Sequence, residues 1–539
     1  MNNRLANQNV RVLVTLALIS TILSTAVEIC LFVSEQYVLY RCFEEKGFSY
    51  GQLFEDDNDT ISYEDFHKMQ EAHQKISWIE SVSNFVRMSF GMITVMIIGY
   101  ISDKFGRKVA LNLMVFGEAL HIGFTGLIVL LQLNPWLVIF PGLFEGVFGG
   151  GLISIIAQVA ACLADITKLP GYSTEDLRNL RPGELARLKR KRWLLFTIYD
   201  GLASFSFAAG SGFGGLLVHR LGFNVAIIIC IILFIASAVG VSFHPETHPD
   251  VVRRKLASIQ SNVDNKEDSV MDIDDDQRSI DFEMDDLITK IKEKFSGMLQ
   301  AVDTSSPVLK VAMGLFFAVS VTIMVDLQYI HIYLMGPPFY WNAQTVGLYA
   351  GVSDALSSCL SIAFTILIFN WEHNREVEPS NKDKTIEIVE DEDVHLTTSE
   401  IRILFIITSI IFAGLSFMFV NKIMMGVAFM FALPTANHII YGASALRLVK
   451  NALIPQIRAI ISLVTSKGKQ GFVLSLSAFI SRVGYLISLT LFPLIYGATV
   501  TIFPGTVFFV CATMVLCTMI FAITLPRGLK QIQANGGVK

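Results

Sequence analysis

The chain has 539 residues, of which 53% are hydrophobic and only 17% are charged, and its mean hydropathy is +0.54. A soluble protein of this composition would expose apolar patches far larger than monomers tolerate, so the composition excludes an ordinary soluble protein and favours a polytopic membrane protein. The formal net charge of −5 is unevenly distributed, because the charges concentrate in a few loops and leave long stretches almost without them.

Apolar runs of membrane-spanning length recur along the chain. A helix needs about 20 apolar residues to cross a hydrocarbon core roughly 30 Å thick. We therefore expect an all-α membrane protein with twelve spans, arranged six plus six, at 11–33, 80–101, 109–133, 137–164, 193–217, 222–243, 308–335, 344–370, 401–420, 423–463, 469–497 and 502–524. The tenth is the least defined, because Pro434 to His438 divide it. One broken helix or an additional interfacial segment both fit that region.

Two acidic segments interrupt the series of predicted spans. We expect residues 1–245 to form one six-helix bundle and residues 307–539 a second one, joined by an acidic cytoplasmic linker at 246–306. A second acidic loop lies at 371–400 inside the second bundle. High charge and little apolar content predict disorder in both segments, with a solvated linker as the simplest role and a regulatory one as the alternative.

Lysine and arginine gather in the segments 102–108 and 166–192. The positive-inside rule places both in the cytoplasm, and an even number of spans then places the N and C termini there too. The segment 34–79 falls outside and contains the glycosylation sequon that begins at Asn58. Residues 283–288 match an acidic dileucine sorting pattern, which favours the plasma membrane or an endolysosomal membrane.

The turn between the second and third spans carries a signature. Residues 99–108 fill every defined position of G-x-x-x-D-[RK]-x-G-[RK]-[RK], which resembles the major facilitator superfamily; the defining residues are Gly99, Asp103, Gly106, Arg107 and Lys108. Two glycines allow a short turn, and the carboxylate of Asp103 can pair with cations or cap a neighbouring helix. The resemblance implies two six-helix bundles that rock about a site at the midplane.

Catalytic signatures are missing from the sequence. It contains no G-x-x-x-x-G-K-[ST] phosphate loop, no H-E-x-x-H and no G-x-S-x-G, and its seven cysteines lack C-x-x-C spacing. We therefore expect a gradient-driven transporter without enzymatic activity, cofactor, metal or nucleic-acid partner. A channel is disfavoured by the signature at 99–108. A solute-sensing transceptor that signals through the acidic loops is the main alternative, and the oligomeric state is left open.

Several stretches resemble solute carrier family 46, which includes the proton-coupled folate transporter. The matching residues are Ala164-Asp165-Ile166; Arg192, Asp200 and Gly214-Gly215; Tyr333, Pro338, Trp341 and Gly347; and Ile457 to Val464 followed by Gln470-Gly471. The resemblance implies that Asp103 and Arg107 form a conformational lock anchored by Asp165. It also implies that Asp200 serves proton coupling and that Arg458 binds substrate.

The chain departs from the family pattern at three positions, the first of which is Leu195, where the family has the second arginine of its span-five pair. The histidine of the family's seventh span aligns with Ile323, and this span carries Asp326 and His331 instead. The half-cystine expected near the end of that span is Tyr340, which leaves Cys42 without its implied disulfide partner. These differences argue against folate itself and leave proton coupling in place.

Ionisable residues at span depth cost about 2.5–3.5 kcal/mol or more each, so each is a candidate for function. They are Glu28, Arg87, Glu118, His121, Glu145, Asp200, Asp326, His331, Asp354, Arg447, Lys450, Arg458 and Arg482. Asp200 and Arg458 are the strongest candidates, because a buried carboxylate can take up and release a proton and a guanidinium binds a carboxylate or phosphate. Glu28, the single charge that we expect at mid-depth in span one, follows.

The remaining candidates allow two interpretations. Glu118 and His121 stand at i, i+3 on one helix face, as a proton relay or as a satisfied polar pair. Asp326 is a further candidate for proton coupling. We expect Arg447 and Lys450 at the cytoplasmic mouth and His331 near an interface. The predicted function is proton-coupled transport of a small organic anion, folate-like or otherwise heterocyclic.

Overall fold

The chain is almost entirely helical. The computed structural model describes residues 2–48, 63–149, 151–166, 182–248, 251–252, 289, 292–293, 296–297, 307–336, 338–376, 398–465 and 470–527. The elements of the first half are α1 (Asn2–Glu44), α2 (Tyr63–Phe105), α3 (Arg107–Leu130), η1 (Pro135–Val138), α4 (Ile139–Val147), α5 (Leu152–Ile166) and α7 (Pro182–Phe243). Those of the second half are α10 (Pro307–Met324), η2 (Val325–Tyr329), α11 (Ile330–Met335), α12 (Ala343–Glu376), α13 (Thr398–Ala428), α14 (Leu433–Arg447), α15 (Lys450–Val464), α16 (Gln470–Thr499) and α17 (Thr506–Ala522).

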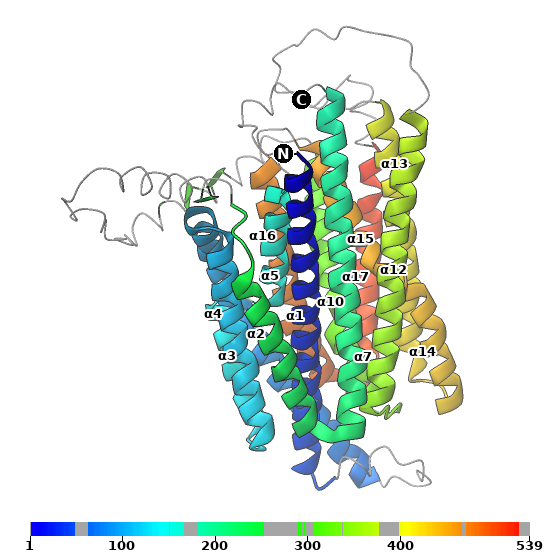
Figure 1. Ribbon diagram of the computed structural model, residues 1–539. Helices are drawn as coiled ribbons and strands as arrows, with labels where there is room; N and C mark the ends of the chain where they lie inside the picture. Colours follow the sequence, from blue (N-terminus) through cyan, green and yellow to red (C-terminus); the bar gives the residue numbers. More distant parts are fainter. Residues whose placement is uncertain are drawn as a thin grey trace, which may run out of the picture.

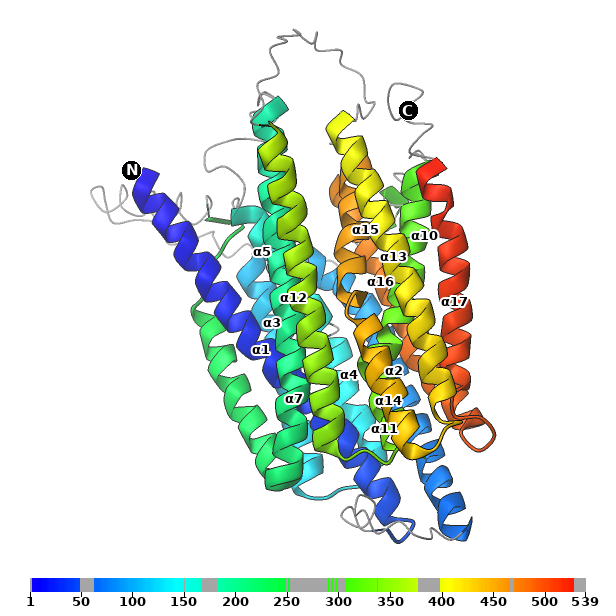
Figure 2. The ribbon, with the colours of Figure 1, turned by 90° about the vertical axis from the view of Figure 1, so that its right-hand side faces the viewer.

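The order of these elements gives twelve crossings in two six-helix bundles, which confirms the predicted fold class. Figures 1 and 2 show the long helices side by side. Within the described ranges, nine stretches are long and apolar enough to cross a membrane. One of them, Ile198–Phe243, supplies two crossings, because Gly222 adopts a φ of +78° that reverses α7. The fourth crossing combines η1, α4 and α5, and the tenth combines α14 and α15. The start of α1 and the end of α17 lie at the same end of the molecule (Figure 2).

The tenth crossing is a broken helix, one of its two predicted forms, but its bounds and the position of its break differ from the prediction. Helix α13 continues to Ala428, so the start of 423–463 belongs to the ninth crossing. Pro434 lies in the first turn of α14, where its missing N–H is harmless, and it does not divide the crossing. The break falls instead between Arg447 and Lys450. The ninth span is predicted to end at residue 420 because Lys422 is charged, but Lys422 lies inside α13.

Several predicted loops are shorter than their sequences suggested. Helix α1 extends to Glu44 and α2 begins at Tyr63, so much of 34–79 is helical; these ends are joined by the ion pairs Lys46–Glu71 and Lys75–Glu45. Residues 371–376 and 398–400, predicted to be disordered, are helical in α12 and α13. Hydropathy misses polar helix ends that project beyond the bilayer. Asn58, the sorting pattern at 283–288 and the acidic runs of both predicted disordered segments lie outside the described residues.

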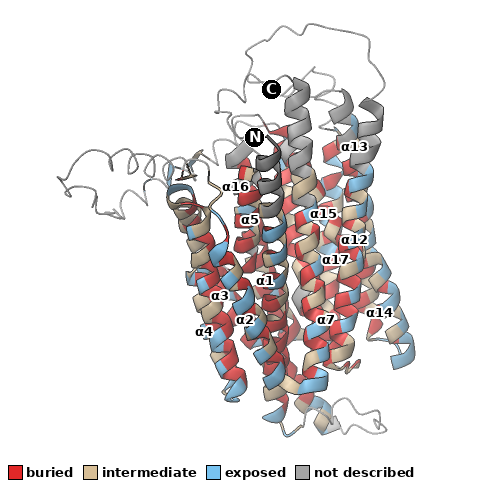
Figure 3. Cartoon of the chain, in the orientation of Figure 1, coloured by how far each residue is buried: buried red, intermediate tan, exposed pale blue. Residues whose placement is uncertain are grey.

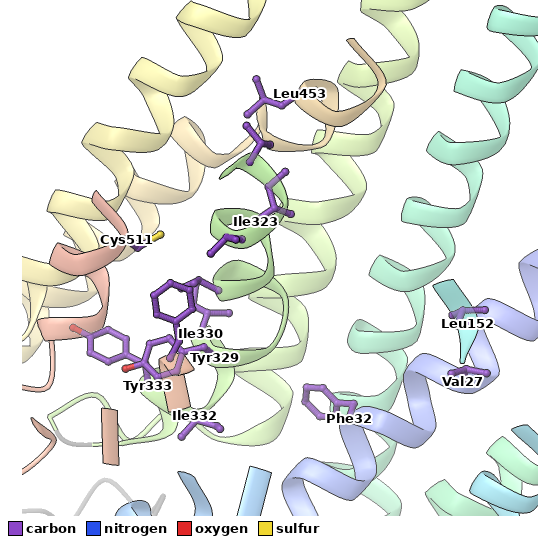
Figure 4. Packing of buried hydrophobic residues seen from close by; sticks show 14 of the residues in the cluster. Val27, Phe32, Leu152, Ile323, Tyr329, Ile330, Ile332, Tyr333, Leu453 and Cys511 are labelled. Carbon is purple, nitrogen blue, oxygen red and sulfur yellow. The ribbon is translucent and has the colours of Figure 1, made fainter. Parts of the chain in front are cut away.

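The outward surface of the helices carries large apolar side chains. Ile93 on α2, Phe213 on α7, Leu367 on α12 and Ile520 on α17 are all more than half exposed, while the facing sides of the helices are buried (Figure 3). A contiguous apolar surface around a helical protein is suited to lipid, where every backbone group must be satisfied inside its own helix. Inside the second bundle, the ring of Tyr333 packs 4.7 Å from that of Phe508, and the ring of Tyr329 lies 5.2 Å from that of Tyr496. Figure 4 shows Tyr329 and Tyr333 within this apolar packing.

The two bundles meet most closely where α7 packs along α12. A Cβ atom on Gly347 would lie 2.7 Å from the carbonyl oxygen of Ser211 and 2.9 Å from the Cα of Gly215. Glycine is therefore required at this contact, because any side chain would separate the two backbones. All seven cysteines are free, Cys42 among them.

Candidate functional site

A cavity of about 570 Å³ lies between the two bundles. It extends from Gly99 and Asp103, at the end of the molecule where α2 passes into α3, to Glu35 and His331 in the interior. We call the end near Asp103 the loop end. Both bundles line the cavity, with Val27 and Phe32 on one side and Ile323 on the other (Figure 4).

At the opposite end the bundles are in direct contact. The Ser81 hydroxyl on α2 donates to the carbonyl oxygen of Thr490 on α16 over 2.8 Å. Helix α7 meets α12 at Gly347, and Gln36 on α1 reaches the sulfur of Met335 on α11 over 3.0 Å. The cavity is therefore closed at this end and reaches the loop end.

Asp200 and Arg458, the two strongest sequence candidates, face each other across the cavity. Nη1 of Arg458 on α15 lies 2.9 Å from Oδ2 of Asp200 on α7, so the pair joins the two bundles. Their side chains are 41% and 21% exposed, respectively, and both line the cavity. The guanidinium also lies 5.6 Å from the centroid of the Phe316 ring, a distance at which a cation is attracted to an aromatic face.

Two carboxylates of α1 line the deeper part of the cavity. Oε1 of Glu28 accepts a hydrogen bond of 2.6 Å from the hydroxyl of Ser211. Oε2 of Glu35 lies 3.0 Å from Nδ1 of His331 on α11, and both side chains are buried. His331 is buried within the protein, and Glu28, which is half-buried, is not the only carboxylate of α1 in the cavity wall. The missed signal is spacing, because Glu35 follows Glu28 by seven residues and lies on the same face.

Glu118 and His121 form part of a larger buried cluster. Nδ1 of His121 lies 3.3 Å from Oε2 of Glu118 and equally 3.3 Å from Oε2 of Glu145 on α4. Nη1 of Arg87 on α2 lies 3.6 Å from the same Glu145 oxygen. Glu145 and Arg87 line the cavity, whereas Glu118 and His121 stand behind them, outside its lining.

Asp326 is placed away from the cavity, in an ion pair with Lys422 of α13. The neighbouring Asp354 lies 2.9 Å from Nη2 of Arg447 and 2.6 Å from Nζ of Lys450. All five side chains are buried; Asp354 and Lys450 also contribute to the wall of the cavity, whereas Arg447 does not. Lys422 was missed because the span was ended before it. We name these five residues the second-bundle charge cluster.

The predicted lock residues come together at the loop end. Nε of Arg107 lies 2.9 Å from Oδ2 of Asp165, and its Nη1 lies 2.9 Å from Oδ1 of Asp103. Gly99 lines the cavity, and Gly106 adopts a φ of +111°, which favours glycine.

The residue missed here is Glu246, which caps α3. Its carboxylate accepts hydrogen bonds from the backbone N–H groups of Arg107 at 2.9 Å and Lys108 at 3.1 Å. It also accepts from those of Thr247 and His248, at 2.9 and 2.8 Å. Capping by a residue 139 positions away along the chain leaves no local sequence signal.

No protein-family model matches the chain, and no curated protein matches it significantly. Solved structures do resemble it. The human organic anion transporter MFSD10 (TETRAN) superimposes with a TM-score of 0.52 and 11% identity, covering 95% of this chain and 99% of that one. The xylose transporter XylE from E. coli, in a partially occluded inward-open conformation, gives 0.52 and 12% over 95% and 97%. A D-xylose–proton symporter gives 0.50 and 12% over 93% and 96%. Together with the twelve crossings, these similarities show that the chain has the major facilitator fold.

Proposed function

We propose that the protein is a secondary active transporter that moves a small organic anion together with protons by alternating access. The observation that carries the proposal is the Asp200–Arg458 ion pair, which joins the two bundles inside the cavity. The fold, the partly exposed position of the pair and the motifs that resemble solute carrier family 46 support it. The substrate would be folate-like or another heterocyclic anion.

The ion pair links proton binding to anion binding. In the observed state Asp200 and Arg458 neutralise each other. A proton on Asp200 removes its charge and frees the guanidinium, which then has two parallel N–H donors for a carboxylate or phosphate group. Proton and anion would therefore enter the site together, and neither alone would be favoured.

The charges of the cavity wall also call for protons. Its carboxylates outnumber its basic side chains; the acidic residues are Glu28, Glu35, Asp103, Glu145, Asp200 and Asp354, and the basic ones are Arg87, Lys450, Arg458 and Arg482. The contacts of Glu28 with Ser211 and of Glu35 with His331 provide no fixed positive charge. Asp103 and Asp354 are paired with Arg107 and Arg447 behind the wall, so Glu28 and Glu35 are the carboxylates whose neutralisation by protons would ease the entry of an anion.

The orientation proposed from the basic loops indicates which side of the membrane the cavity faces in the observed state. If residues 102–108 lie in the cytoplasm, the cavity reaches the cytoplasmic end and the contact between α2 and α16 closes the other end. Transport would then require that contact to separate while the loop end closes. The membrane would be the plasma membrane or an endolysosomal one.

The test is uptake into vesicles under a pH gradient, screened over folates and other organic anions. We expect faster uptake at a pH of about 5.5 than at about 7.5, since protons are a co-substrate. Arg458→Ala should abolish uptake, whereas Arg220→Ala, at an exposed position on α7, should leave it unchanged. Asp200→Asn should remove the pH dependence. A flat pH profile in the parent protein would exclude the proton, and normal uptake by Arg458→Ala would exclude this anion site.

A further inference from the structure

We propose that Glu118, His121 and Glu145 form a binding site for a divalent transition-metal ion in the wall of the first bundle. Each residue offers one ligand atom, and these atoms lie within 4.8 Å of one another. Glu118 and His121 come from α3, and Glu145 comes from α4. The site is separate from the Asp200–Arg458 pair and does not depend on the proposed substrate.

The spacing of the ligand atoms suits a metal better than a hydrogen bond. Nδ1 of His121 is 3.3 Å from a carboxylate oxygen of Glu118 and 3.3 Å from one of Glu145. Good N–H···O bonds measure about 2.7–3.2 Å, and a single Nδ1 hydrogen cannot serve two acceptors well. In a tetrahedral zinc site, bonds of about 2.0–2.1 Å place neighbouring ligand atoms about 3.3–3.4 Å apart.

Two carboxylate oxygens in the cluster need a partner. Among the described residues, neither Oε1 of Glu118 nor Oε2 of Glu145 has a hydrogen-bond partner, and both are buried. Their side chains are only 1% and 7% exposed. A buried oxygen without a donor costs about 1–3 kcal/mol, and more when it is charged. A cation bound by Oε2 of Glu145, the oxygen that faces His121, would give that oxygen its missing partner.

The charge of the cluster also favours a cation. Metal ligation requires a neutral imidazole; with His121 neutral, two carboxylates face one guanidinium, Arg87, and a bound cation would balance the remaining negative charge. Nη2 of Arg87 donates to Oδ1 of Asn84 over 2.7 Å, which holds the guanidinium beside the cluster. Arg87 would therefore weaken metal binding without occupying the site.

The ligand atoms indicate which kind of ion would bind, and the position of the cluster indicates how it would enter. One imidazole nitrogen with carboxylate oxygens suits Zn²⁺ or Mn²⁺, whereas Ca²⁺ and Mg²⁺ prefer oxygen ligands alone. Glu145 and Arg87 line the cavity, so the ion would enter from it. Gly151 also serves the site, because a Cβ atom there would overlap the carboxylate of Glu145.

The experiment is a calorimetric titration of the purified full-length protein in lipid nanodiscs with Zn²⁺ and with Mn²⁺. We expect one site, weakened about tenfold or more by each of Glu118→Gln, His121→Gln and Glu145→Gln. Arg87→Gln should tighten it, because this variant removes the competing cation; a merely structural role of the cluster would not produce that change. The matched control is His438→Gln, at an exposed histidine of α14, which should bind as the parent does.

A second measurement covers variants that fail to fold. Co²⁺ added to the parent protein should produce the visible absorption of a tetrahedral nitrogen–oxygen site, and Zn²⁺ should displace it. Binding that persists in all three glutamine variants would overturn the proposal. Binding that disappears in His67→Gln would do so too, because His67 and Glu71 form a surface pair with Nδ1 and Oε1 3.3 Å apart. Absence of metal binding by the parent would assign the excess charge to a proton on His121 instead.

Discussion

The cavity ion pair and the second-bundle charge cluster use the same kinds of side chains in opposite settings. Asp200 and Arg458 join helices of different bundles and remain partly exposed, whereas Asp326 and Lys422 join helices of one bundle and are 1% and 0% exposed. A buried pair holds its partners firmly, because breaking it leaves an uncompensated charge. A partly exposed pair exchanges partners with water, protons or ligand at little cost. Burial therefore distinguishes the Asp200–Arg458 pair, which we propose changes partners during transport, from the Asp326–Lys422 pair, which stabilises the fold.

The largest effect should follow removal of one charge from the buried cluster. Asp326→Ala leaves Lys422 buried without its counter-ion and should lower the free energy of unfolding by about 3–5 kcal/mol. The measurement is the thermal unfolding midpoint of the purified protein, together with its expression level.

The double variant Asp326→Leu with Lys422→Met is the control for charge. It removes both charges and keeps the volume apolar, so it should recover much of the lost stability. If the double variant is as unstable as the single one, packing rather than charge holds η2 to α13, and the contrast with the cavity pair fails.

The next effect concerns a contact between the bundles that contains no charge. Gly347→Ala introduces a methyl group against the backbone of α7, and we expect a cost of about 1–3 kcal/mol from overpacking. Uptake should fall as well, since closure of this end requires the close approach. Gly123→Ala, where a Cβ meets no atom within 4 Å, is the matched control and should be neutral or stabilising. An equal loss in both variants would show that helix propensity, not the contact, is being measured.

Sequence reasoning succeeded where the signal was local and repeated. The apolar runs gave the crossings, and the spacing of Gly99 to Lys108 gave the fold. Asp200 and Arg458 were singled out by chemistry and resemblance, and the structure places them 2.9 Å apart although 258 positions separate them. The apolar runs gave a wrong end for the span that contains Lys422. A charged residue interrupts such a run, even when a partner on another helix makes its burial possible.

Partners from distant parts of the chain explain the other misses. Glu145 completes the cluster of Glu118 and His121 only through the packing of α4 on α3. Glu35 was excluded by a helix end placed too early, and its partner His331 belongs to the other bundle. Composition and periodicity describe one helix at a time, so they predict which residues are buried and not which ones meet.

A smaller effect should appear at the loop end. Glu246→Gln weakens the carboxylate cap of α3 while preserving its shape, and should cost about 1 kcal/mol. Since this carboxylate binds backbone N–H groups, its loss measures capping without the contribution of an ion pair. The measurement is the unfolding midpoint, with Glu64→Gln in the exposed first turn of α2 as the control. A loss of stability as large as that of Asp326→Ala would show that Glu246 is as important for the fold as the buried charge cluster.

The smallest effect on stability should come from the residue with the largest effect on transport. Arg458→Ala removes a partly exposed partner, and pairs of this kind contribute about 0–1 kcal/mol, so the unfolding midpoint should barely change while uptake is lost. Arg458→Lys sharpens the test, because it keeps the charge and loses the planar fork; it should retain stability and recover only part of the uptake. A drop in stability comparable to that of the buried cluster would mean that Arg458 is scaffold too. The loss of uptake would then report a damaged fold, and the distinction between the two ion pairs would disappear.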